Sequence, residues 1–210
     1  VHDEQPLKRD IQNLTDATEH SDAVDVFMNA ASPGVVSLFH TNQFYPDDDE
    51  YLEALAAVMR REYEAIHAAG LMLQIDCPDL AMGRHTQYRE LSATDFLKRA
   101  AVQVEVLNAA LVNIPANRVR MHVCWGNYEG PHHLDIPLEQ LFDTLMAAKP
   151  NGLLIESSNP RHAHEWELFR SRSLPDEKVL IPGVIDSVTN YIEHPELVAQ
   201  RIIRFADLVG

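Results

Sequence analysis

Short apolar segments alternate with long amphipathic segments along most of this chain. The apolar segments have the length of strands and lie at residues 24–32, 71–76, 118–124, 152–157 and 179–186. Between them, apolar residues recur with helical spacing, as Leu52, Leu55, Met59 and Ile66 do. Regular alternation of strands with helices predicts a parallel sheet covered by helices.

Capping and turn signals mark where the helices begin and end. The first predicted helix, over residues 47–69, opens with an acidic run and closes on Gly70, and the second starts at SATD (92–95) and reaches about residue 111. Three further helices are predicted. One covers about residues 138–148, one lies near 162–169, and the last begins at Pro195, which suits a first helical turn.

Two α/β architectures have this alternation, an open doubly wound sheet and a closed (β/α)8 TIM barrel. No GxGxxG sequence follows the first strand, which disfavours a dinucleotide-binding sheet. Side chains alternate faces along a strand, so within RVRMHVC (118–124) one face holds Val119, Met121 and Val123, and the other holds Arg120, His122 and Cys124. One face of each strand is apolar and the other turns polar at its C-terminal end, where barrel enzymes place their chemistry.

Polar residues stand at the C-terminal ends of the predicted strands, and a barrel would bring them to one mouth: Asn29, Asp76, His122, Cys124, Glu156 and Asp186. A barrel needs eight strands, and five are readable here. The sequence therefore predicts a single, partial barrel domain over residues 1–210, with about two strands absent before Val24 and one after Gly210. Cut sheet edges would be exposed or paired with a second copy, which leaves a homo-oligomer open.

Charge and cysteine content narrow the class of partner. The formal net charge is −15, from 17 basic and 32 acidic residues, and such a surface repels nucleic acid. No stretch of 18 uncharged apolar residues occurs, so we expect no membrane partner. The N-terminal VHDEQPLKRD has no signal-peptide pattern, and Cys77 and Cys124 are too few for a disulfide scaffold, which together predict a cytoplasmic protein.

The strongest local signal is His122-Val-Cys124. Residues two apart on a strand point the same way, and imidazole and thiolate are ligands that zinc binds in tetrahedral geometry. Glu156 ends the next predicted strand and adds a carboxylate at the same edge. These three residues are the predicted metal ligands.

Three segments resemble the last strands of the catalytic barrel of cobalamin-independent methionine synthases: HVCWGN (122–127), IESSNPRH (155–162) and IPGVID (181–186). The resemblance covers about residues 24–210 and implies zinc bound by His122, Cys124 and Glu156, with a fourth, cysteine ligand expected beyond Gly210. QIDCPDLA (74–81) resembles the strand whose aspartate contacts the amino-acid substrate, which implies that role for Asp76.

The activity that this resemblance implies is zinc-dependent transfer of a methyl or alkyl group to a thiol, as in the 5-methyltetrahydropteroyltriglutamate–homocysteine methyltransferases of methionine biosynthesis. The partners would be a small-molecule thiol and an alkyl donor. Asp76 and Asp186 are the candidate catalytic residues, and the candidate substrate contacts are Asn29, Asp76, Trp125 and His132.

Two positions depart from the family pattern. Cys77 replaces a glutamate, and Val188 stands where the family has a histidine thought to transfer a proton to the folate. Both changes argue against methyltetrahydrofolate and homocysteine as the substrates. The chain also resembles epoxyalkane:coenzyme M transferases, and two alternatives remain open: a metal-free barrel like uroporphyrinogen decarboxylase, and a degenerate barrel that only binds a ligand or partner.

Several residues near these segments have both a structural and a functional interpretation. Trp125 either packs beside the site or stacks on a substrate, and His132 either contacts substrate or lies in a solvated loop. His162 and His164 either donate hydrogen bonds and protons near Glu156 or cap a helix. Cys77 is expected to be a small packed residue rather than a ligand.

Overall fold

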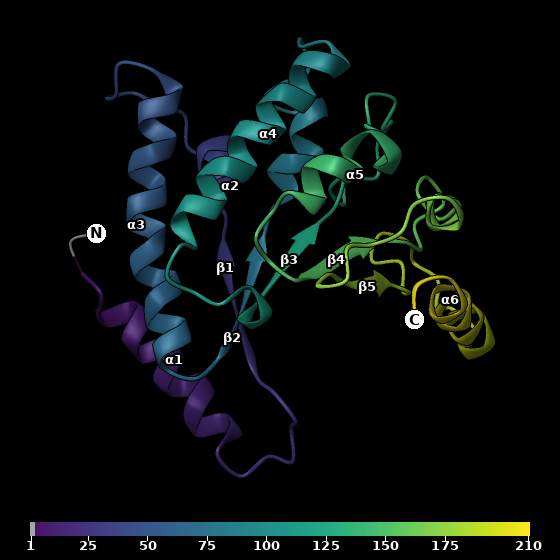
Figure 1. Cartoon of the computed structure of the whole chain (residues 1–210), viewed down its shortest axis with the longest axis horizontal. Coiled ribbons are helices and arrows are strands. Elements are labelled where there is room, and N and C mark those ends of the chain that lie inside the picture. Colours follow the sequence, from purple (N-terminus) through teal and green to yellow (C-terminus); the bar gives the residue numbers. More distant parts are fainter. Residues whose placement is uncertain (1–2) are drawn as a thin grey trace.

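The structure is a computed structural model that describes residues 3–210, and it is built on one five-stranded sheet (Figure 1). The strands are β1 (Phe27–Ala31), β2 (Met72–Asp76), β3 (Val119–Val123), β4 (Gly152–Glu156) and β5 (Val179–Gly183). All neighbouring strands are parallel, in the order β1-β2-β3-β4-β5. Sequential parallel order is that of a (β/α) barrel, so the predicted α/β class is confirmed, as a part of a barrel whose sheet is not closed.

Helices connect and cover these strands. The α-helices are α1 (Gln5–Thr18), α2 (Pro33–Phe39), α3 (Asp48–Ala68), α4 (Ala93–Ala110), α5 (Leu138–Met146) and α6 (Pro195–Val209), and the 3₁₀ helices are η1 (Pro78–Leu80), η2 (Met82–His85), η3 (Ala116–Arg118) and η4 (Glu165–Arg170). Four predicted helices are confirmed as α3, α4, α5 and α6. The helix predicted near 162–169 was wrong in type and extent, since only the 3₁₀ helix η4 forms there. Across residues 3–210, no helix combines the length and the apolar character that crossing a membrane requires.

Side-chain caps fix the starts of the two longest helices. The Asp47 carboxylate accepts hydrogen bonds from two backbone N–H groups at the start of α3. At the start of α4, the Ser92 hydroxyl accepts one from the N–H of Asp95. Each cap contributes roughly 1 kcal/mol to helix stability. After α3, Gly70 turns the chain toward β2 with a φ of 83°, a conformation that favours glycine.

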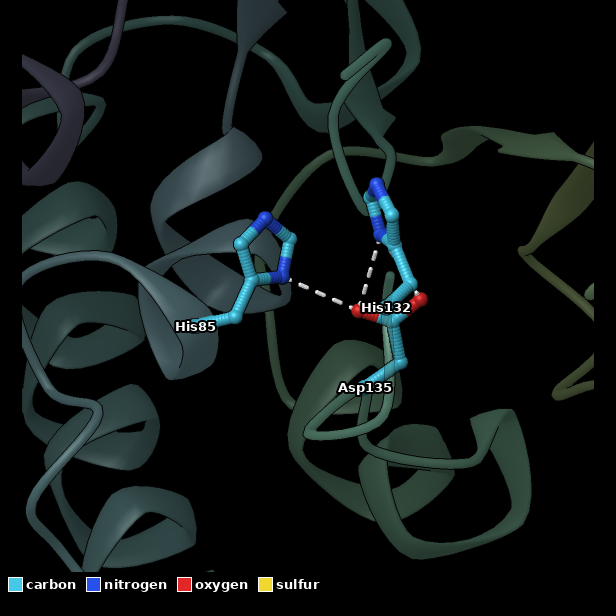
Figure 2. A group of neighbouring side chains, drawn as sticks. All are labelled: His85, His132 and Asp135. Carbon is cyan, nitrogen blue, oxygen red and sulfur yellow. Dashed lines mark hydrogen bonds and ion pairs between the residues drawn. The ribbon is translucent and has the colours of Figure 1, made fainter. Parts of the chain in front are cut away.

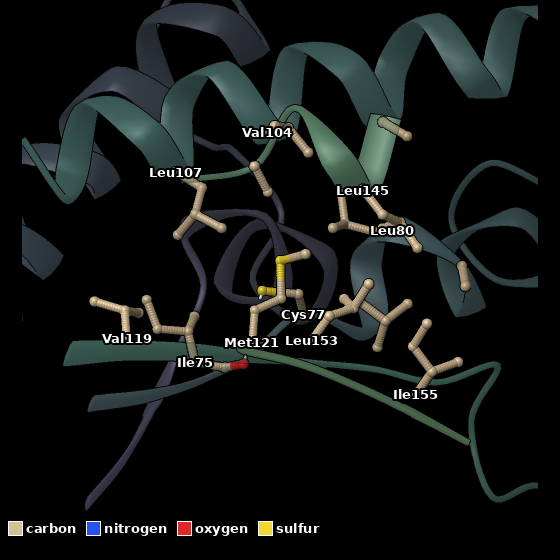
Figure 3. Close-up of a cluster of buried hydrophobic side chains, with 14 of the residues drawn as sticks. Ile75, Cys77, Leu80, Val104, Leu107, Val119, Met121, Leu145, Leu153 and Ile155 are labelled. Carbon is tan, nitrogen blue, oxygen red and sulfur yellow. Dashed lines mark hydrogen bonds between the residues drawn. The ribbon is translucent and has the colours of Figure 1, made fainter. Parts of the chain in front are cut away.

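One face of the sheet carries the hydrophobic core. Figure 3 shows α4 lying above the strands, with the side chains of α4 and α5 pointing down and those of the strands pointing up. The buried residues drawn there include Val104, Leu107, Leu145, Val119, Met121 and Leu153. Burying a side chain of this size contributes about 1.5–3 kcal/mol, so this layer holds the strand ends at fixed positions.

The opposite face of the sheet carries polar residues. The register pairs Asn29 with Gln74 and Asp76 with His122. In β3 the alternation of fully and partly buried positions puts His122 on the face opposite Met121. Because parallel strands end at one edge of a sheet, β2, β3 and β4 bring their last polar residues together.

Candidate active site

A cavity of about 450 Å³ opens over the C-terminal ends of β2, β3 and β4. Its polar lining includes Asp76, His122, Cys124, Asn127 and Glu156, and its apolar lining includes Val35, Phe39, Pro78, Met82, Leu154 and Ile185. The three predicted metal ligands and Asp76 thus share one cavity. Its mixed lining suits a small molecule that has both a polar and an apolar part.

Asp76 and His122 form the best-defined contact in this cavity. The two residues are register partners on adjacent strands, and Asp76 Oδ1 lies 2.5 Å from His122 Nδ1. Such a carboxylate fixes the proton on Nδ1 and leaves Nε2 to act as a ligand. Burial lowers the pKa of His122, but hydrogen bonds with Asp76 and Cys124 outweigh it and raise that pKa to about 10, so a metal ion would have to displace the proton on Nε2.

Asp76 therefore has a structural partner that the sequence did not predict. Its side chain is 52% exposed, compared with 28% for His122. The predicted contact of Asp76 with a substrate is compatible with this position, because about half of the side chain is exposed and Asp76 lines the cavity. Asp76 can hold the imidazole and meet a ligand at the same time.

Glu156 supplies an unusual carboxylate at the end of β4. Its Oε1 atom is buried and makes no hydrogen bond within the described residues. Burial is the main cause of a raised pKa for Glu156, and the negative charge of Asp186 adds to it, while His162 and Arg161 oppose it. A buried acceptor without a donor is costly unless a cation or a ligand binds it.

The donor set of this cavity fits zinc in kind. His122 offers a nitrogen, Cys124 a partly exposed sulfur and Glu156 a carboxylate oxygen, and all three are accepted zinc ligands. The three ligand atoms are spread more widely than those of a formed site. In the part of the chain that the structure describes, the one group with all ligand atoms within 4.8 Å of one another is a different one, His85, His132 and Asp135.

The remaining predicted mouth residues, Asn29 and Asp186, lie to either side of this cavity. Asn29 lines a neighbouring cavity of about 520 Å³, which shares Asp76 and His122 with the first. Asp186 is 8% exposed, and its Oδ1 accepts a hydrogen bond from the backbone N–H of Val188. It lines a separate hollow, so the structure does not bring Asp186 into the cavity of the predicted zinc ligands.

Trp125 and His132, the other two predicted substrate contacts, have buried side chains. Trp125 is fully buried, and its Nε1 donates a hydrogen bond of 2.7 Å to the carbonyl of Ile136. The His132 side chain is 1% exposed and is held by Asp135 and by the carbonyl of Tyr128. Both side chains are packed within the loop that follows β3, and neither lines the cavity.

Sequence reasoning did not single out Asp135. Its carboxylate accepts contacts from His85, His132 and His162, which come from loops after three successive strands. The available signal was the histidine three residues before Asp135, directly ahead of α5. That spacing identifies a local pair, whereas His85 and His162 reach it only through the tertiary fold.

Comparisons with known proteins agree with the fold and go no further. No protein-family model matches the sequence, and no curated protein does. A solved structure does match. It is a B12-independent methionine synthase from Shewanella sp. W3-18-1 in complex with selenomethionine, with a TM-score of 0.74 and 17% sequence identity. The match covers 95% of this chain and 56% of that one, so this chain spans little more than half the length of that enzyme. At this level of identity the match shows a shared fold.

Proposed function

We propose that this chain provides His122, Cys124 and Glu156 to a zinc site that transfers a methyl or alkyl group to a small-molecule thiol, in the manner of methionine synthases. The observation that carries the proposal is the Asp76–His122 contact of 2.5 Å, made in the same cavity as Cys124 and Glu156. A carboxylate on Nδ1 is the usual partner of a metal-bound histidine, because it fixes the tautomer and the ring orientation.

The chemistry of the donors supports a thiol substrate. Zinc, when bound, keeps a coordinated thiol in its thiolate form at neutral pH, and a thiolate is the nucleophile that alkyl transfer needs. Glu156 fits the same picture, since the ion would supply the partner that its buried Oε1 lacks. In the reaction a sulfur–carbon bond forms while the bond from that carbon to its donor breaks, and the thiol proton is released on binding.

The cavity indicates what kind of thiol fits. Asp76 at one side offers an acceptor for an ammonium or hydroxyl group, and Val35, Phe39 and Leu154 offer apolar contacts for a short carbon chain. The structural neighbour was solved with selenomethionine, an amino acid that has an ammonium group and a short chain but no thiol. We therefore propose an amino-acid-like or similarly small polar thiol.

The identity of the alkyl donor is a separate question from the identity of the thiol. Cys77, where the family has a glutamate, is fully buried in the core and does not line the cavity. Val188, where the family has a histidine, offers no proton. We propose that the alkyl donor is not methyltetrahydrofolate bound in the family's usual way, while zinc and the thiol half of the reaction are retained.

Metal analysis of the purified protein tests the zinc site. We expect about one zinc lost on His122→Ala and on Cys124→Ser, together with any zinc-dependent alkylation of a thiol. Cys77→Ala is the matched control, because it removes the other thiol of the chain at a position away from the cavity. Unchanged zinc content in both site variants, with normal folding by circular dichroism, would overturn the proposal.

A further inference from the structure

A second group of potential ligands lies in the segments that follow β2 and β3 (Figure 2). His85 ends η2, which follows β2, while His132 and Asp135 belong to the loop between β3 and α5. Figure 2 shows both imidazoles turned toward the Asp135 carboxylate. The side chains of His85, His132 and Asp135 are 13%, 1% and 9% exposed, so water hardly reaches them.

The distances in this group are those of hydrogen bonds, and they are close to the separations between ligand atoms around a metal ion. Asp135 Oδ1 lies 3.0 Å from His85 Nδ1, and Asp135 Oδ2 lies 3.1 Å from His132 Nδ1. All three ligand atoms can be chosen within 4.8 Å of one another. A tetrahedral zinc with bonds of about 2.0–2.1 Å separates its ligand atoms by about 3.3 Å, so small shifts would admit the ion.

A neutral His132 would have a hydrogen-bonding conflict that either a second proton or a metal ion removes. Its Nε2 lies 2.6 Å from the carbonyl oxygen of Tyr128, and its Nδ1 faces the carboxylate of Asp135. Both neighbours are acceptors, whereas a neutral imidazole carries one N–H. If Nε2 donates to the carbonyl, the lone pair of Nδ1 points at a carboxylate. A proton on Nδ1 relieves this repulsion by a hydrogen bond, and a metal ion between the two groups relieves it by binding both.

The Asp135 carboxylate has a further hydrogen-bonding partner, His162, as metal-binding carboxylates commonly do. His162 Nε2 lies 2.9 Å from Asp135 Oδ2, and His162 Nδ1 lies 3.0 Å from Glu165 Oε2. The His162 ring is fixed in turn by stacking on Trp125, with 3.8 Å between the ring centroids. An outer partner of this kind orients the ligand and is part of most metal sites.

We propose that His85, His132 and Asp135 form a metal site that takes a divalent transition-metal ion such as zinc, separate from the site of His122 and Cys124. Two imidazoles and one carboxylate suit zinc and similar ions, with a water as fourth ligand. The ion would join η2 to the loop after β3. Those two segments also line the first cavity through Met82 and Asn127, so the second site would set the shape of the cavity wall.

Titration with zinc alone tests the proposal in a background without the first site. In Cys124→Ser we expect one zinc to bind, and in Cys124→Ser with His85→Ala we expect affinity to fall by more than about 100-fold. His162→Gln, which alters an outer partner, should weaken binding by about 10–100-fold. His133→Ala is the matched control, because it removes an exposed histidine from the same loop.

Cobalt(II) distinguishes this site from the one in the proposed function. A cobalt–thiolate absorption band reports Cys124, and the second site has no sulfur and gives no such band. In His85→Ala we expect the thiolate band to remain while one equivalent of cobalt is lost. If Cys124→Ser binds no zinc, or binds one that His85→Ala leaves unchanged, the second site does not exist. Should His85→Ala not fold, Asp135→Asn replaces it, since it keeps the size of the side chain and removes the charge.

Discussion

Asp76 Oδ1 lies 2.5 Å from His122 Nδ1, and the two residues face each other across adjacent parallel strands. The contact follows directly from the register, since the last residue of β2 pairs with the histidine of β3. A histidine placed at a strand end without such a partner would be free to rotate. With it, Nε2 is turned to a fixed direction, and the ring is oriented to bind a cation that displaces the Nε2 proton.

Removing the Asp76 carboxylate should weaken metal binding and leave the fold intact. We expect Asp76→Ala to lower zinc affinity by about 10–100-fold, because the ring loses its orienting partner and becomes less basic. Affinity can be measured by competition with a chelating dye. Asp22→Ala, at an exposed aspartate before β1, is the control and should bind zinc as the wild type does. Equal affinities in the two variants would show that Asp76 does not position His122.

Neutralising Glu156 should separate metal binding from stability. Glu156→Gln keeps the shape of the side chain and removes the charge of a carboxylate whose Oε1 is buried and has no hydrogen-bond partner among residues 3–210. With chelator present, we expect the free energy of unfolding of this variant, measured in urea, to be no more than about 0.5 kcal/mol below that of the wild type. With zinc present, the gain in stability should shrink by about 1.4 kcal/mol for each tenfold loss of affinity.

The control for this pair of measurements is Glu167→Gln, at an exposed position in η4. It should change neither value. A zinc-induced gain in Glu156→Gln as large as in the wild type would exclude Glu156 as a ligand.

The strands and their faces could be read from the sequence because they depend on local alternation. RVRMHVC predicts that His122 and Cys124 share a face, and the structure has His122 on the face opposite Met121. The sequence did not predict α2, because its residues PGVVSLF look like a continuation of the preceding apolar segment. The turn into helix comes from Ser32, whose hydroxyl accepts from the N–H of Val35.

The packing of Trp125, His132 and Asp135 could not be predicted in the same way. Trp125 and His132 follow a strand that ends at the cavity, and that position alone favours contact with a ligand. Their burial depends on Ile136 and Tyr128, which the loop brings back over them. Asp135 becomes important only because His85 and His162 reach it from other loops, and no local pattern encodes such a meeting.

Transfer of a methyl group from methyltetrahydrofolate to homocysteine should be slow or absent. General acid catalysis contributes about 10²–10⁴-fold, and Val188 cannot supply it. Its backbone N–H instead donates a hydrogen bond of 3.0 Å to Asp186 Oδ1. Assays should compare this donor with simpler alkyl donors, at saturating zinc and thiol. Turnover with the folate that matches or exceeds that of the simpler donors would contradict the prediction and point to another residue as the acid.

A buried carboxyl group makes the stability of this fold depend on pH. Asp79 is 2% exposed, and the Ser32 hydroxyl donates a hydrogen bond of 2.6 Å to its Oδ1. Burial is the main reason that the pKa of Asp79 rises to about 7, with the hydrogen bond from Ser32 acting in the opposite direction and the charge of Asp76 adding to the rise. Gly34 leaves room for it, because a Cβ there would lie 2.1 Å from Asp79 Oδ2.

The folded protein should therefore lose stability as pH rises from about 4 to about 7. In that window the unfolded chain has released the Asp79 proton, since its pKa there is about 3.9, while the folded protein still holds it. Asp79→Asn removes this dependence, so its unfolding free energy should rise relative to wild type by up to about 4 kcal/mol between pH 4 and pH 8. Urea unfolding at several pH values measures the difference, and Asp176→Asn, at an exposed aspartate, should show none. If the difference between Asp79→Asn and wild type stays constant over this range, Asp79 ionises as an ordinary carboxylate and the buried, protonated state assigned to it is wrong.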